Sequence, residues 1–214
     1  SARATSAALL GKFVLLGELD AIKPALKDLV TDQLVNVVLG SEQPRVKQRA
    51  LESLGYSSHP AVPELIRNAY ESSDIPWITS ALCAMGCSAD DVWAHQVENM
   101  ISSPEPEVQF EAIRAAGELE LSSAREPLLS MLEEDIEDEE IRLALIWALS
   151  QIGGSDVKEK LEELLDNAST DDEIEWIEKA IENLDIASSG NMELLDFSPG
   201  DEDDEDEIDS DEDD

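Results

Sequence analysis

Apolar residues recur along the chain at steps of three and four positions, the spacing that places them on one face of an α-helix. In residues 108–116 they are Val108, Ala112, Ile113 and Ala116. Glycine and proline separate successive stretches of this kind, and no stretch shows sustained alternation of apolar and polar residues with turn dipeptides. The pattern predicts an all-α chain whose helices are joined by short turns.

The helical pattern returns at a nearly constant interval. Equivalent apolar positions in successive copies are separated by 31, 31, 33 and 33 residues, at Val46, Trp77, Val108, Ile141 and Ile174. A second helix is predicted in each of four copies, at residues 61–71, 91–101, 123–133 and 156–165. Its equivalent apolar positions are Ile66, Val97, Leu128 and Leu161. One helical hairpin cannot cover its own apolar face, so neighbouring hairpins must stack.

These features predict a right-handed α-solenoid of stacked antiparallel helical hairpins over residues 1–187. It has about five repeats, the first diverged and the last incomplete. Three first helices end near a glycine, which we expect to take the left-handed conformation that stops a helix; these are Gly55, Gly86 and Gly117. Residues 188–200 are predicted to be a linker with a short apolar segment, and residues 201–214 a disordered acidic tail.

The most regular copies lie at residues 108–119 and 141–153. The first of them reads Val108-Gln109-Phe110-Glu111-Ala112-Ile113-Arg114-Ala115-Ala116-Gly117-Glu118-Leu119. This string resembles the short HEAT-type repeat of phycobilisome-lyase-like proteins, and the resemblance covers roughly residues 5 to 185. It implies a solenoid that acts as a scaffold. It also raises an alternative function, a bilin-lyase-like subunit that acts with a partner subunit on a tetrapyrrole.

The net charge of −37 arises from 14 basic and 51 acidic side chains. It argues against nucleic acid and anionic membranes as partners, because phosphate recognition needs clustered Lys and Arg, and no apolar run is long enough to span a bilayer. This charge is unevenly distributed. Residues 1–100 carry 8 basic and 12 acidic side chains, a net charge of −4. Residues 101–200 carry 6 basic and 27 acidic side chains, a net charge of −21, and residues 201–214 carry a net charge of −12. Seven carboxylates within residues 133–140 predict a solvated loop. Shielding or chaperoning a basic protein is therefore a second alternative function.

Catalytic and metal-binding chemistry has few residues available to it. His59 and His95 are too few for the di-iron site that resemblance to the deoxyhypusine hydroxylases would imply. Cys83 and Cys87 lie four residues apart in a predicted helix, where a disulfide would be strained, and no second pair completes a four-ligand zinc site. We expect no catalytic residue, cofactor or metal, and a reducing, cytoplasmic environment. No secretory signal is visible, and we expect a fragment or a processed form.

The predicted function is a non-enzymatic scaffold that binds another protein through the solenoid, and a basic surface on that protein is one option. We expect the second helices to form the concave face, since solenoid curvature creates extended binding surfaces. The candidate partner-binding residues are the outward positions of that face together with one apolar residue of a first helix: Asn68, His95, Asn99, Lys158, Glu159, Glu162 and Glu163, and Trp147.

Two outward columns on the first helices change from polar to apolar along the chain. One column is Gln48, Thr79, Phe110, Leu143 and Trp176. The other, one turn further on, is Glu52, Cys83, Arg114, Trp147 and Ala180. Two interpretations are open: the later repeats bury this face against one another, as is usual for aromatic residues, or the face is an exposed groove in which Trp147 and Trp176 are anchors.

Overall fold

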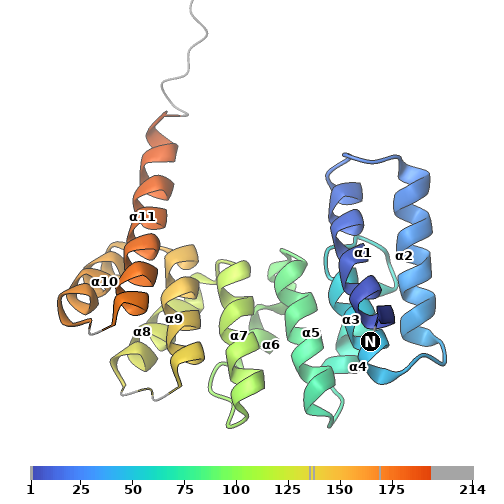
Figure 1. Cartoon of the computed structure of the whole chain (residues 1–214), viewed down its shortest axis with the longest axis horizontal. Coiled ribbons are helices and arrows are strands. Elements are labelled where there is room, and N and C mark those ends of the chain that lie inside the picture. The colour runs from blue at the N-terminus through green and yellow to red at the C-terminus, as the bar shows by residue number, and fades with distance from the viewer. Residues whose placement is uncertain (1, 135, 137, 169, 194–214) are drawn as a thin grey trace, which may run out of the picture.

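The protein is a row of helical hairpins in two layers (Figure 1). The computed structural model describes residues 2–134, 136, 138–168 and 170–193, and within them all regular structure is helical. The first helices of the hairpins are α1 (Ala2–Glu18), α3 (Pro44–Leu54), α5 (Ile75–Cys87), α7 (Pro106–Glu118), α9 (Glu139–Ile152) and α11 (Asp171–Glu193). The second helices are α2 (Pro24–Leu39), α4 (Val62–Tyr70), α6 (Ala94–Glu98), α8 (Arg125–Glu133) and α10 (Ser155–Asn167). The predicted all-α solenoid is confirmed.

Helix boundaries follow the sequence pattern with three refinements, the first of which is that α6 ends at Glu98 and not at residue 101 as predicted. The second helices of the third and fourth hairpins begin with a 3₁₀ turn, η1 (Asp91–Trp93) and η2 (Ser122–Ala124). At the other end of the chain, α11 continues to Glu193 and so includes residues 188–193, which the sequence assigns to the start of the linker. Glycine and serine lower helix propensity by about 1 kcal/mol or less per residue, which does not by itself end a helix. The remaining linker residues and the acidic tail of residues 201–214 lie outside the described residues.

The core is one continuous cluster of buried side chains that runs from α1 to α11. The apolar column predicted for the second helices lies inside it, with at most 1% of each side chain exposed: Ile66, Val97, Leu128 and Leu161. The core positions predicted for α7 are also buried. The periodicity of apolar residues therefore identifies the buried face of both layers correctly.

The three recurring glycines have a different role from the one predicted. Gly55 has helical φ and ψ angles of −51° and −36°, and neither Gly86 nor Gly117 has a positive φ. These glycines instead permit neighbouring first helices to approach closely. A β-carbon on Gly55 would lie 2.6 Å from the carbonyl oxygen of Ala84, and one on Gly117 would lie 2.8 Å from the Cα of Ala148. The prediction of left-handed helix stops is wrong because backbone contact, not chain reversal, requires glycine here.

Three described non-glycine residues have a positive φ, and each lies three positions beyond a glycine. They are Asp20 after α1, Ala89 after α5 and Glu120 after α7, with φ between 49° and 56°. Each is a non-glycine residue in a turn between the two helices of a hairpin, where the chain reverses direction. The close packing of the first helices and the reversal of the chain are thus separated in the sequence.

The first helices form the more closely packed layer. Successive first helices contact one another directly from α1 through α11, whereas the second helices contact chiefly the first helices of their own and the following hairpin. A curved stack is shorter on its inner side, so the layer whose helices approach most closely lines the concave side. The prediction that the second helices form the concave face is therefore wrong, and the glycine contacts between first helices are the physical reason.

Candidate functional site

An apolar cavity of about 350 Å³ opens between α7, α9 and α11 on the concave side. Trp176 from α11 is 42% exposed beside it, and Lys179 lies 5.8 Å from the centre of its ring. The Trp147 ring lies over α7, where a β-carbon on Gly117 would approach its Cζ3 atom to 2.7 Å. The lining residues are Phe110, Arg114, Glu140, Leu143, Ala144, Trp147 and Trp176.

An acidic cavity of about 260 Å³ adjoins the apolar one between α5, α7 and α9. Four carboxylates and no basic side chain are among its lining residues. The Asp138 carboxylate also caps α9, because its Oδ1 atom accepts hydrogen bonds from the backbone N–H groups of Glu140 at 3.0 Å and Ile141 at 3.3 Å. The lining residues are Thr79, Pro106, Glu107, Phe110, Glu111, Asp138, Glu140 and Ile141.

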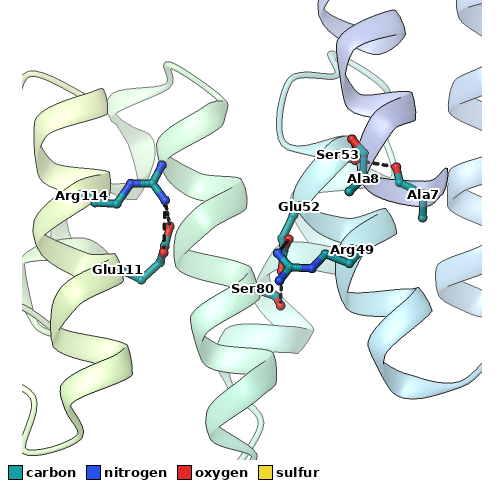
Figure 2. A network of polar contacts seen from close by, with 8 residues as sticks. All are labelled: Ala7, Ala8, Arg49, Glu52, Ser53, Ser80, Glu111 and Arg114. Carbon is teal, nitrogen blue, oxygen red and sulfur yellow. Dashed lines mark hydrogen bonds and ion pairs between the residues drawn. The ribbon is translucent and has the colours of Figure 1, made fainter. Parts of the chain in front are cut away.

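A third, polar cavity of about 610 Å³ lies over α3, α5 and α7. Figure 2 shows two of its polar clusters: Arg49 and Ser80 both donate to the Glu52 carboxylate, at 2.5 and 2.8 Å, and Arg114 donates to Glu111 at 3.1 Å. The remaining lining residues are Arg45, Gln48, Pro76, Thr79, Cys83 and Glu107.

The three cavities share residues and form one continuous feature, which we call the first-helix groove. The polar and acidic cavities share Thr79, Glu107 and Glu111, and the acidic and apolar cavities share Phe110 and Glu140. Its character changes from mixed charge over α3 and α5, through acidic between α5 and α9, to apolar at α11. All residues of the two outward columns recognised in the sequence line it, except Ala180.

Glu111 is the most deeply buried charged residue of the groove, with 8% of its surface exposed. Burial raises the pKa of its carboxyl, and Arg114 opposes this shift only in part. Native Glu111 therefore retains its proton to a higher pH than Glu111 in the unfolded chain. By linkage, this residue makes stability fall as the pH rises past the ordinary glutamate pKa of about 4.3.

Glu111→Gln is expected to raise the thermal unfolding midpoint at pH 7, since the amide keeps the shape of the side chain and removes the buried charge. The gain should shrink as the pH is lowered and vanish below about pH 4.3, where both the native and unfolded glutamate are neutral. Arg114 keeps Glu118 as a partner at 3.6 Å. Circular dichroism melts of both proteins from pH 4 to 8 measure the difference; a lower midpoint for the variant at pH 7 would contradict the prediction.

Cys83 and Cys87 are both free thiols and half-buried on α5. A hydrogen bond to Cys87, together with burial, raises the pKa of the Cys83 thiol, so this groove residue carries a proton at neutral pH. A protonated thiol is a poor nucleophile and a poor metal ligand. Within the described part of the chain, no three His, Cys, Asp or Glu side chains gather closely enough to hold a metal ion.

Most of the candidate residues named from the sequence lie away from the groove. Asn68, His95, Asn99, Glu159, Glu162 and Glu163 are exposed on the second-helix side, and half-buried Lys158 forms an ion pair with Asp185. His95 and Asn99 contact each other, with 3.2 Å between Nε2 and Nδ2. Of the eight candidates, Trp147 alone lines the groove.

Phe110, Leu143 and Trp176 line the apolar cavity but are missing from the predicted binding set. Their signal is present in the sequence as the column that turns apolar towards the C-terminal repeats. Of the two interpretations of that column, the structure supports the groove, because Trp176 is 42% exposed and Phe110 and Leu143 are only partly buried. The prediction omitted these three residues because it placed the binding surface on the second helices.

Stacked hairpins with a groove along one layer define an α-solenoid repeat protein. Residues 95–182 match the family model of HEAT repeats. The match covers the fourth and fifth hairpins, α7 with α8 and α9 with α10, where the sequence resemblance is strongest, and extends into α11. It does not distinguish the phycobilisome-lyase-like type of repeat, which stays a prediction.

The crystal structure of an engineered protein from the Northeast Structural Genomics Consortium is similar with a TM-score of 0.48 and 20% sequence identity, over 84% of this chain and 96% of that chain. A search of curated proteins finds no match. No helix in the described ranges has the length and apolar character needed to cross a membrane.

Proposed function

We propose that the protein is a non-enzymatic interaction scaffold that holds a segment of a partner protein in the first-helix groove. The observation that carries this proposal is the apolar cavity of about 350 Å³ beside Trp176, an indole that is 42% exposed. Aromatic side chains at the rim of a preformed cavity are typical anchors of protein interfaces, because they bury a large area with few rotatable bonds.

The groove is suited to a polypeptide because its chemistry varies along its length. An apolar cavity accepts one large side chain, and the polar and acidic cavities next to it offer carboxylates and arginines to the flanking residues. HEAT repeats are used widely as protein-binding scaffolds, in line with the matched family. The partner itself, a cytoplasmic location and the absence of catalysis remain predictions.

The bilin-lyase-like alternative is less well supported by the groove. A bilin carries two propionates, which favour basic partners. Arg114 is the one basic side chain that lines the apolar cavity, and it already pairs with Glu111 at 3.1 Å and with Glu118 at 3.6 Å. A protein segment therefore remains the better proposal for the occupant of this cavity.

The proposal is tested with peptides selected on the wild-type protein from a displayed random-peptide library. Trp176→Ala is expected to weaken their binding about 30-fold, the effect of losing an interface anchor of about 2 kcal/mol. Its thermal midpoint should fall less than that of a variant truncated in the core, because Trp176 is 42% exposed. Fluorescence anisotropy with labelled peptides measures the affinities.

Val92→Ala is the matched control. Val92 is 63% exposed in η1, outside the groove, so truncating it removes exposed apolar surface from another face. Its affinity for the selected peptides should equal that of the wild type. Peptides that bind the wild type and Trp176→Ala equally well would refute the groove as the binding site.

A further inference from the structure

The first-helix groove places an acidic cavity directly beside an apolar one. The two cavities share Phe110 and Glu140, so a segment that fills one of them reaches the other within a few residues. This arrangement deepens the proposed function, on which it rests, because it restricts the chemistry of the segment that the groove accepts.

The carboxylates of the acidic cavity are not neutralised equally within the protein. Glu111 pairs with Arg114, and Asp138 caps α9. Glu107 and Glu140 are exposed and form no ion pair with any described residue. The cavity wall therefore presents at least two carboxylates that have no basic partner among the described residues.

The burial of Glu111 also favours a positively charged group in the acidic cavity. Removing this carboxyl from water disfavours its ionised form, and its own arginine offsets the effect only in part. A positive charge entering the cavity would stabilise the ionised form of Glu111 as well as Glu107 and Glu140. Interactions in a concave, partly desolvated site are also less screened by salt than those on an open surface.

We propose that the partner segment carries a basic side chain next to a large apolar side chain. The apolar side chain fills the cavity between Phe110, Trp147 and Trp176. The Lys or Arg beside it reaches Glu107 and Glu140. The order of the two residues along the partner is free, because the cavities adjoin and either chain direction brings them into register.

Charge complementarity favours this occupant over the two that the protein itself supplies. A second copy of this chain brings a net charge of −37, and the apolar residues 192–197 of this chain carry acidic neighbours. Either would place negative charge against Glu107 and Glu140. A basic and apolar segment of another protein meets both halves of the site with favourable contacts.

The experiment sequences the peptides that the wild-type protein enriches from a displayed random-peptide library. The expected result is enrichment of Lys or Arg within one or two positions of a large apolar residue. Glu107→Gln/Glu140→Gln is expected to weaken those peptides about five- to tenfold, as for two partly screened ion pairs. It should also flatten the fall in affinity between low and high salt.

Glu159→Gln/Glu162→Gln is the matched control, since it removes the same charge from exposed positions of α10 on the second-helix side. This variant should bind as the wild type does. Equal losses in the two double variants would attribute the effect to net charge and overturn the proposal.

The remaining outcomes separate this inference from the proposed function. Peptides that need Trp176 but show no excess of basic residues overturn the inference and leave the groove as a binding site. Enrichment of apolar and acidic sequences resembling residues 192–197 assigns the groove to the chain's own segment. Self-association that Trp176→Ala abolishes assigns it to a second copy. If no enriched peptide depends on Trp176, the proposed function itself fails.

Discussion

Leu145→Ala is expected to destabilise the protein by about 2 to 5 kcal/mol. Leu145 lies in the middle of α9 and is 0% exposed, so the truncation leaves a cavity that the packed neighbours fill only in part. Because each repeat of a solenoid depends on its neighbours, the loss weakens the stacking on both sides of α9. Urea unfolding followed by circular dichroism measures the change.

Leu143→Ala, two residues earlier on the same helix, is the matched control. Leu143 is partly exposed at the groove and not buried between the layers. We expect it to cost less than about 1.5 kcal/mol of stability, and to weaken the binding of peptides that depend on Trp176. A similar loss of stability at the two positions would show that α9 does not separate a core face from a groove face.

Gly117→Ala is expected to destabilise the protein by about 1 to 3 kcal/mol, although alanine is ordinarily the better helix former. The new methyl group would lie 2.7 Å from Cζ3 of Trp147 and 2.8 Å from the Cα of Ala148. One of these atoms belongs to the backbone of α9, so the two helices must move apart. Chemical unfolding of the variant gives the free energy, and near-ultraviolet circular dichroism reports the displacement of Trp147.

Gly86→Ala provides the comparison, because its nearest contact, with the Cα of Ala115, would be 3.1 Å. The smaller overlap is offset by the gain of about 0.5 to 1 kcal/mol from replacing glycine within a helix. The expected result is a change close to zero. A stabilised Gly117→Ala, or equal losses at Gly86 and Gly117, would contradict the assignment of close helix contact to Gly117.

The buried faces of the helices could be read from the sequence because burial imposes a regular spacing. The column Ile66, Val97, Leu128 and Leu161 recurs once per repeat, and all four side chains are in the core. The register of the later hairpins follows from the same spacing, so the all-α solenoid fold needed no information beyond the amino-acid pattern.

The concave layer could not be read from apolar spacing, because both layers bury one face in the same way. What distinguishes them is how closely helices of one layer approach, and this depends on small residues whose meaning is ambiguous. Gly55, Gly86 and Gly117 suit either a helix stop or a backbone contact. Their recurrence opposite alanines of the next first helix is the feature that would have favoured contact.

The groove was only partly accessible to sequence reasoning for a similar reason. The column ending in Phe110, Leu143 and Trp176 shows that an outward position becomes apolar, but a partly buried and a fully buried aromatic give the same pattern. The distinction depends on the shape that α7, α9 and α11 leave between them. The neighbouring acidic cavity likewise combines Glu107 with Asp138 and Glu140 of the next repeat, which become close only when the hairpins stack.

The glycine contacts between first helices fix the distance from one repeat to the next along the groove. Helices in close contact have axes about 8 to 10 Å apart, and an extended polypeptide advances about 3.3 Å per residue. A segment laid across the first helices therefore passes one repeat about every two to three residues. Gly55 and Gly117 leave no room for a side chain between neighbouring helices, so this step is held nearly constant. In a segment bound as proposed, the side chains that contact successive repeats would therefore be spaced about two to three residues apart.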